Sequence, residues 1–227
     1  MTKPPVSGFA KHFFWGASTA AHQVEGGLHN QWTVWELENA RSLAAQAEYH
    51  VGDFASWERI KQDASSPHNY VSGLATNHAH RYKEDFDLLQ KMNMNAYRFS
   101  IEWSRIEPEE GSWNAEAITY YKEYLKELKH RDIEPVVTLL HFTMPVWFAE
   151  KGGFTRRANV KYFVRYVEKV MTELGQDMKW IITINEPEVY STLSYIAQMW
   201  PPAERNILKA LIVLGNLAKA HNRAAKL

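Results

Sequence analysis

A unit made of one short apolar run and one amphipathic helix recurs along this chain, and this repeat limits the possible folds more than any other feature. The apolar runs span Phe13–Ala17, Tyr97–Ile101, Val136–Leu140 and Trp180–Ile184. They are short and almost continuously apolar, as in parallel strands that are covered on both faces. The sequence therefore predicts a parallel sheet built from four βα units.

Between and after these runs, apolar residues recur three and four positions apart, which is the spacing of a helix with one buried face. The four stripes are Tyr82, Phe86, Leu89 and Met92; Ile118, Tyr121, Leu125 and Leu128; Phe163, Val167, Val170 and Leu174; and Ile207, Leu211, Leu214 and Ala218. We expect each stripe to mark the face with which one helix packs against the sheet.

A doubly wound sheet and half of an eight-stranded barrel both fit four such units. No Gly-x-Gly-x-x-Gly follows the first apolar run, which disfavours a dinucleotide-binding sheet. The connection Ser18–Arg81 is long, with helix-like pieces at Trp35–Ala47 and Phe54–Lys61, and the 227 residues leave no room for eight units. Long loops after barrel strands commonly build active sites. No linker or low-complexity tract divides the chain, so we expect residues 1–227 to form a single partial domain.

Composition excludes several classes of partner. The 26 basic residues balance 26 acidic ones, so charge favours neither nucleic acid nor an anionic membrane. Cysteine is absent, which excludes disulfides and thiolate metal sites. Met1–Lys11 has no apolar leader core, and no run of about 18 apolar residues occurs, so we expect a cytoplasmic protein. The 13% aromatic content suits stacking on sugar rings, although large core side chains explain it equally well.

Polar clusters follow each of the four apolar runs. They are Gln23–Gly26, Arg98–Pro108, His141–Pro145 and Thr183–Pro187. Because the carboxyl ends of parallel strands meet at one edge of a sheet, we expect these clusters to converge on one site. Taken singly, Arg98 could be a buried ion-pair partner, His141 a core histidine and Glu186 a turn residue before proline. The pair His78 and His80 has no evident third ligand, so we predict neither a metal nor a cofactor.

Together, these motifs resemble glycoside hydrolase family 1, the β-glucosidases and β-galactosidases. Phe14–Gly26 is similar to the family's N-terminal signature, and Tyr97–Pro108 and Thr183–Pro187 are similar to its second-strand and acid/base motifs. Asn-Glu-Pro alone occurs in several barrel families, but Gln-x-Glu-Gly and Arg-Phe-Ser-x-x-Trp-x-Arg before it make the resemblance specific. The resemblance implies a (β/α)8 TIM-barrel fold, of which this chain holds about the first four βα units, a half-barrel with a long loop after the first strand.

The resemblance also implies a role for five residues. Glu186 matches the general acid/base, Asn185 the residue that binds the sugar 2-hydroxyl, and Arg98 the cation beside the nucleophile. Gln23 and His141 match residues that bind other sugar hydroxyls. The chemistry is consistent, because an acid that acts near neutral pH needs its pKa raised, and retention of configuration needs a second carboxylate about 5 Å away.

The nucleophile is missing from this pattern. The family carries it in a Thr-Glu-Asn-Gly type of motif on the seventh strand, whereas Glu25, Glu102 and Glu107 match no nucleophile position. The third-strand motif also departs from the family, since Leu140-His141-Phe142 stands where His-His-Trp is common. We therefore predict a β-glycosidase for β-linked glycosides or oligosaccharides that is inactive without a complementing second half. The expected protein partner is this C-terminal half-barrel or a second copy of the chain.

Two other interpretations remain open at this point. The chain could be a non-catalytic half-barrel that binds sugar or acts as a self-associating scaffold. It could also belong to another barrel family with Asn-Glu-Pro, such as the cellulases, although the motifs around Gln23 and Arg98 disfavour that family.

Overall fold

Four parallel strands form the centre of this protein, in a computed structural model that describes residues 8–10 and 12–227. Most of Met1–Lys11, discussed above for its lack of an apolar leader core, lies outside the described residues. The sheet order is β1-β2-β3-β4, and neighbouring strands are parallel. The strands are β1 (Gly16–Ser18), β2 (Ala96–Ser100), β3 (Glu134–Thr138) and β4 (Trp180–Ile182). The predicted half-barrel of four βα units is confirmed.

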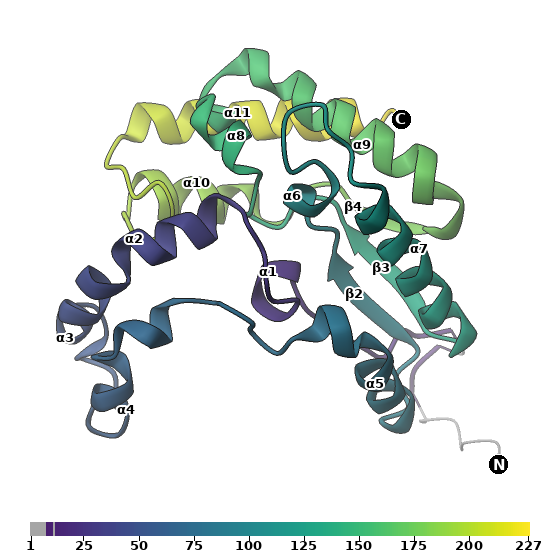
Figure 1. Ribbon diagram of the computed structural model, residues 1–227, viewed down its shortest axis with the longest axis horizontal. Helices are drawn as coiled ribbons and strands as arrows, with labels where there is room; N and C mark the ends of the chain where they lie inside the picture. Colours follow the sequence, from purple (N-terminus) through teal and green to yellow (C-terminus); the bar gives the residue numbers. More distant parts are fainter. Residues whose placement is uncertain (1–7, 11) are drawn as a thin grey trace.

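Four long helices lie side by side in an arc along the outside of the sheet (Figure 1). They are α5 (His78–Lys91), α7 (Ala115–His130), α9 (Val160–Leu174) and α11 (Ile207–Ala224). Shorter helices begin soon after the strands end: α1 (Ala21–Val24), α6 (Trp103–Ile106), α8 (Val146–Glu150) and α10 (Pro187–Tyr195). Three 3-10 turns flank α9: η2 (Gly153–Thr155), η3 (Arg157–Asn159) and η4 (Gly175–Asp177).

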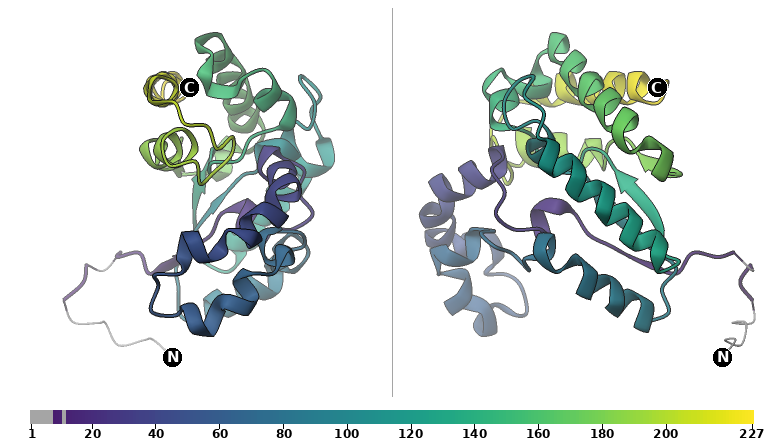
Figure 2. Two further views of the ribbon diagram at one scale, coloured as in Figure 1. Left: turned by 90° about the vertical axis from the view of Figure 1, so that its left-hand side faces the viewer. Right: turned by 45° about the vertical axis from the view of Figure 1, so that its right-hand side comes forward.

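The long loop after β1 folds into an arm that projects from the sheet (Figures 1 and 2). It contains α2 (Gln31–Ala45), α3 (Ala47–Val51), α4 (Trp57–Ala64) and η1 (Pro67–Tyr70). Asn30 caps α2, because its side chain accepts hydrogen bonds from the amides of Trp32 and Thr33, and the Asn30 amide in turn donates to Thr33 Oγ1. In the described part of the chain, no helix combines the length and the apolarity that a membrane crossing requires.

The alternation of side chains along β2 separates the core from the concave face of the sheet. Tyr97 and Phe99 are buried against the helices, where Phe99 lies 4.6 Å, ring centre to ring centre, from Tyr124 of α7. Because successive side chains of a strand point to opposite faces, Arg98 points to the inner, concave face. The sheet is curved enough that Phe14, beside β1, and Trp180, in β4, meet across it with ring centres 5.8 Å apart.

The prediction for the buried face of α11 is wrong. Ile207 and Leu211 of the predicted stripe are 65% and 63% exposed, whereas the helix buries Ala210, Val213, Leu217 and Ala220. The helix carries two apolar stripes, and periodicity alone does not say which one packs. The stripe rich in alanine allows α11 to lie close against α9 and α10.

Candidate active site

Four of the five candidate residues lie beyond the carboxyl ends of the strands, and the fifth, Arg98, lies in the middle of β2. Arg98 is in β2, His141 follows β3, and Asn185 and Glu186 follow β4. Gln23 lies in α1, directly after β1. Since the four strands are parallel neighbours, their ends share one edge of the sheet, which is where enzymes with parallel sheets place their active sites.

Asn185 connects three of the other four residues. Its side-chain oxygen accepts a hydrogen bond from Arg98 Nη2. Its Nδ2 lies 3.5 Å from His141 Nε2 and 3.4 Å from Glu186 Oε2. Arg98 is fixed a second time, since its Nε donates to Thr138 Oγ1 over 3.1 Å. Side chains from three strand ends therefore form one continuous polar chain.

Gln23 is not part of this polar chain. Its side chain is exposed, and within residues 12–227 it forms no hydrogen bond with the other four candidates. The helix that carries it is nevertheless fixed, because the Ala21 amide donates to Ser100 Oγ at the end of β2 over 2.8 Å.

The turns after β3 and β4 hold the site in an unfavourable backbone conformation. Phe142 has φ +69°, and Glu186 has φ +41° and ψ +60°, which is the left-handed region that non-glycine residues rarely adopt. The Asn185 amide donates to Leu140 O over 2.9 Å and so ties the two turns together. Pro187 then begins α10 in a position that suits proline. Backbone strain of this kind is concentrated at functional sites.

His141 is a neutral side chain in this environment. Burial, together with the nearby charge of Arg98, lowers the pKa of His141 to about 4. Its Nδ1 is buried and has no hydrogen-bond partner among the described residues. A neutral imidazole offers one donor and one acceptor, which suits the binding of an uncharged hydroxyl group.

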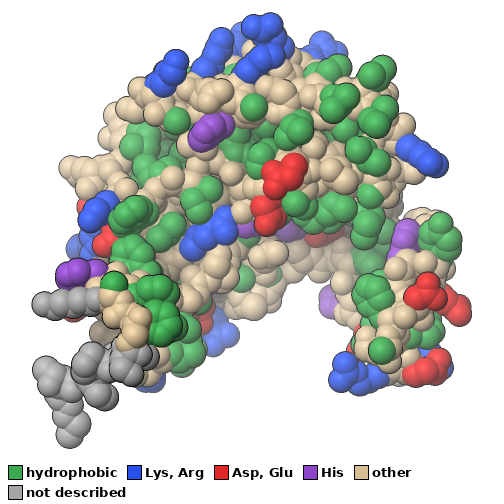
Figure 3. Space-filling view, turned by 180° about the vertical axis from the view of Figure 1, so that it is seen from behind, with side chains coloured by type: hydrophobic (Ala, Val, Ile, Leu, Met, Phe, Trp, Pro, Cys, Tyr) green, Lys and Arg blue, Asp and Glu red, His purple; other side chains and the backbone are tan. Residues whose placement is uncertain are grey.

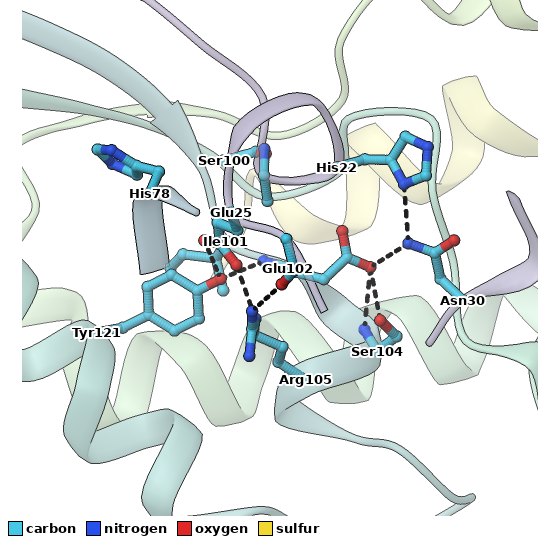
Figure 4. A network of polar contacts seen from close by, with 12 residues as sticks. His22, Glu25, Asn30, His78, Ser100, Ile101, Glu102, Ser104, Arg105 and Tyr121 are labelled. Carbon is cyan, nitrogen blue, oxygen red and sulfur yellow. Dashed lines mark hydrogen bonds and ion pairs between the residues drawn. The ribbon is translucent and has the colours of Figure 1, made fainter. Parts of the chain in front are cut away.

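A second, buried network braces the loops that follow the strands (Figure 4). Glu102, 1% exposed, follows β2. One of its carboxylate oxygens accepts from Thr143 Oγ1 over 2.7 Å, and the other accepts from Ser104 Oγ over 2.7 Å and Asn30 Nδ2 over 3.5 Å. A single carboxylate thus ties the loop that carries His141 to the start of the arm.

Glu25 braces α1 in the same way (Figure 4). Its carboxylate accepts hydrogen bonds from Arg105 Nε over 2.7 Å and from the Tyr121 hydroxyl over 2.9 Å. Burial raises the pKa of Glu25 to about 7, although Arg105 and Tyr121 act in the opposite direction. The structural roles of Glu25, Glu102 and Thr138 were not predicted from the sequence. For Glu102 the one available signal was a carboxylate directly after an apolar run, and the partner of Glu25 is 80 residues away in the sequence.

Four βα units with a polar cluster at the strand ends are the pattern of a (β/α)8-barrel enzyme. The sequence profile of glycosyl hydrolase family 1 matches residues 6–227, and the chain belongs to this family.

Individual relatives agree with the family assignment. Beta-glucosidase A of Acetivibrio thermocellus is 31% identical over 223 residues, which is 96% of this chain and 45% of the relative. Among solved structures, a β-glycosidase from Pyrococcus horikoshii is 36% identical, with a TM-score of 0.79 over 96% of this chain and 45% of its own. The chain therefore spans about half the length of the relatives that it matches.

A third relative has been solved with ligands. The β-glucosidase from Thermotoga maritima is 28% identical and matches 96% of this chain and 46% of its own. It has been determined in complex with glucoimidazole, with a TM-score of 0.75, and with deoxynojirimycin, with a TM-score of 0.76.

Proposed function

We propose that this chain supplies the acid/base half of a retaining β-glycosidase, with Glu186 as the proton donor. The observation that carries the proposal is the polar chain in which Asn185 contacts Glu186, Arg98 and His141 at the ends of neighbouring strands. Membership of glycosyl hydrolase family 1 and the sugar-like ligands of the Thermotoga relative support the same chemistry.

In the proposed reaction, Glu186 donates its proton to the glycosidic oxygen as the bond to the sugar breaks. A second carboxylate, about 5 Å away and contributed from outside this half-barrel, attacks the anomeric carbon and forms a covalent glycosyl ester. The ionised Glu186 then removes a proton from water, which attacks the ester and releases the sugar. Arg98, at the centre of the inner face, stabilises the negative charge of the nucleophile before the attack.

The other candidates orient the sugar. Asn185 is held by Arg98 and is therefore fixed in a position to bind a hydroxyl beside the reacting carbon. Neutral His141 and exposed Gln23 offer hydrogen-bond groups to further hydroxyls. We propose β-linked glycosides or oligosaccharides as substrates, because each of these groups complements an uncharged hydroxyl rather than an ion.

The test compares leaving groups on a completed barrel. The chain is combined with a separately produced second half of a family 1 barrel, and hydrolysis of a nitrophenyl and a dinitrophenyl β-glucoside is measured. We expect Glu186→Gln to slow the nitrophenyl substrate by about 10²–10⁴-fold, the usual contribution of acid catalysis. The comparison uses kcat/KM, which reports the step that forms the glycosyl ester and not the later hydrolysis in which Glu186 acts as base. On this measure the dinitrophenyl substrate should lose much less, because its leaving group departs without a proton.

Glu188→Gln is the matched control, since Glu188 is an exposed glutamate in the first turn of α10. It should leave both rates near the wild-type values. Equal losses with both substrates in Glu186→Gln would contradict the role as acid. Sugar binding by the completed barrel without any turnover would favour the alternative, a non-catalytic half-barrel that binds sugar.

A further inference from the structure

The loop that carries His141 has no regular secondary structure, so its backbone groups need partners from elsewhere in the protein. Residues 139–145 form this loop, which connects β3 to α8. Within it, the Thr143 amide donates to His141 O over 2.8 Å, and Phe142 has a left-handed backbone with φ +69°. A disfavoured conformation of this kind persists only where surrounding contacts hold it.

Gln31, the first residue of α2, binds this loop at three points. Its amide donates to Met144 O over 3.0 Å. Its side-chain Oε1 accepts from the Met144 amide over 2.6 Å, and its Nε2 donates to Phe142 O over 3.4 Å. A single residue of the arm thus satisfies both backbone groups of Met144 and reaches the residue next to His141.

The helix that Gln31 begins keeps it in place. The first amides of a helix have no partner within it, so the Gln31 amide is available to the loop. Asn30, directly before it, caps α2 and extends its Nδ2 to within 3.5 Å of Glu102 Oε1. Gln31 is also half-buried, which limits competition from water for its side-chain amide. The loop is therefore bound by a residue whose own position is fixed.

A second anchor holds the loop by a side chain rather than by its backbone. Thr143 Oγ1 donates to Glu102 Oε2 over 2.7 Å, which ties Thr143 to the residue after β2. This bond does not replace the contacts of Gln31. In the described part of the chain, no other hydrogen bond reaches the backbone of Met144.

The His141 ring depends on the loop for its direction, because its own polar contacts are weak. Its Nε2 lies 3.5 Å from Asn185 Nδ2, beyond the usual length of a hydrogen bond, and its buried Nδ1 has no partner among the described residues. The Phe142 ring packs against the imidazole, with ring centres 4.8 Å apart. A ring held in this way follows the backbone that carries it.

We propose that Gln31 is a positioning residue, which joins the arm to the loop after β3 and thereby fixes the direction of the His141 imidazole. This inference rests on the proposed glycosidase function, in which His141 binds a hydroxyl of the sugar, and it adds control of that binding by the arm. Gln31 acts through the backbone of Phe142 and Met144 and not by contact with the substrate.

The first test is an NMR titration of the His141 imidazole in the chain itself, as wild type and as Gln31→Met. Methionine is similar in length to glutamine but has no amide group to bind the loop. In the wild type, burial and the charge of Arg98 lower the pKa of His141 to about 4. We expect the loosened loop of the variant to admit water, so that this pKa rises by about one unit or more. At pH 5 the imidazole would then be about half protonated rather than about one tenth.

Gln46→Met is the matched control, since it makes the same change at the other end of α2. The Gln46 side chain is exposed and bonds only locally, to Ser42 Oγ and His50 Nε2 over 3.4 and 3.3 Å. This variant should leave the pKa of His141 at about 4.

Hydrogen exchange of the Met144 amide provides a measurement on the wild type, which does not depend on the folding of Gln31→Met. This amide lies in a loop, and Gln31 Oε1 is its acceptor. We expect it to exchange slowly, as amides do whose hydrogen bond rarely opens.

The second test is a double-mutant cycle on the completed barrel, with kcat/KM for a nitrophenyl β-glucoside as the measure. Gln31→Met alone should lower kcat/KM about tenfold, which corresponds to about 1.4 kcal/mol. In His141→Ala it should lower kcat/KM by less than about twofold further, because the imidazole through which Gln31 acts is absent. Gln46→Met should lower it in neither background.

Three results would overturn the proposal: an unchanged pKa of His141 in folded Gln31→Met, rapid exchange of the Met144 amide in the wild type, or equal losses of kcat/KM in both backgrounds of the cycle. Failure of the glycosidase proposal is distinguishable from these. The completed barrel would then hydrolyse no β-glycoside, while the titration and the exchange on the chain alone would still show the effect of Gln31.

Discussion

Glu186, the proposed proton donor, has a backbone conformation that reduces the stability of the fold. Its left-handed conformation, φ +41° and ψ +60°, is disfavoured for a side chain with a Cβ, and asparagine tolerates the same region better. We expect Glu186→Asn to raise the free energy of unfolding by about 1 kcal/mol, measured by urea denaturation.

Glu188→Asn is the control for this substitution, because Glu188 lies in regular helix two residues later. Glu188→Asn should not raise the free energy of unfolding, since asparagine is a poorer helix former than glutamate. A loss of stability in Glu186→Asn would show that the left-handed turn stores no strain. A gain would indicate that glutamate is kept at this position for a reason other than folding.

Glu25 makes stability depend on pH. Its pKa is about 7 in the folded protein and 4.5 ordinarily, so the folded state binds this proton more tightly. The stability that Glu25 contributes is therefore complete below pH 4.5 and is lost as pH rises towards 7, by at most about 1.4 kcal/mol per pH unit. Wild type and Glu25→Gln are compared by urea denaturation from pH 4.5 to 8. The free energy of unfolding of the wild type should fall relative to that of Glu25→Gln as pH rises.

The comparison with Glu25→Gln cancels the opposite effect of His141, which is present in both proteins. The pKa of His141 falls from 6.5 to about 4 on folding, so its contribution favours folding more as pH rises from 4 to 6.5. The exposed Glu109 provides the control, and Glu109→Gln should follow the wild type at each pH. A difference between wild type and Glu25→Gln that stays constant with pH would contradict the shifted pKa.

At the scale of elements, the start of α2 joins the arm to the edge of the sheet that carries the candidate active site. Asn30 is 0% exposed, caps the helix with its Oδ1, and extends its Nδ2 towards Glu102. Asn30→Ala should therefore cost about 2 kcal/mol, the upper end for a lost cap, because a buried acceptor also loses a donor. Asn206 only caps the exposed start of α11, so Asn206→Ala should cost about 1 kcal/mol in the same thermal or urea unfolding measurement. Equal costs would show that the contact with Glu102 adds nothing.

The sequence predicted the strands and helices better than the contacts that these elements make with one another. Local periodicity indicated β2 to β4 and the helices α5, α7 and α9, because a strand or helix with one buried face leaves a regular apolar pattern. It gave the wrong face for α11, where two apolar stripes compete. The braces at Glu25 and Glu102 could not be predicted, since each joins residues such as Tyr121 or Thr143 that are distant in sequence and meet only in the folded chain.

The whole molecule is a curved sheet covered by helices on its outer side. Seen from behind, the body is separated from the arm by a deep notch, and apolar side chains are spread over the exposed face (Figure 3). Phe13, Phe14 and Trp15 before β1 are 41%, 44% and 43% exposed, and Trp180 in β4 is 44% exposed. β1 and β4 are the edge strands of the sheet, and apolar edge strands readily pair with further strands.

We therefore expect a second set of βα units to pair with β1 and β4. Hydrogen exchange on this chain alone should find amides of β4 exchanging faster than those of β2, which is paired on both sides. Adding the second half of the Pyrococcus horikoshii relative should slow the exchange of the β1 and β4 amides by about tenfold or more, which corresponds to about 1.4 kcal/mol of protection. Exchange in β2 and β3 should stay nearly unchanged.

Ile182→Lys places a charge on the edge strand β4 and should prevent the complex, whereas Leu37→Lys, on the exposed face of α2 in the arm, should not. Protection of β4 in the isolated chain at every protein concentration would contradict the idea that this strand is an open edge; protection that grows with concentration would indicate pairing with a second copy of the same chain.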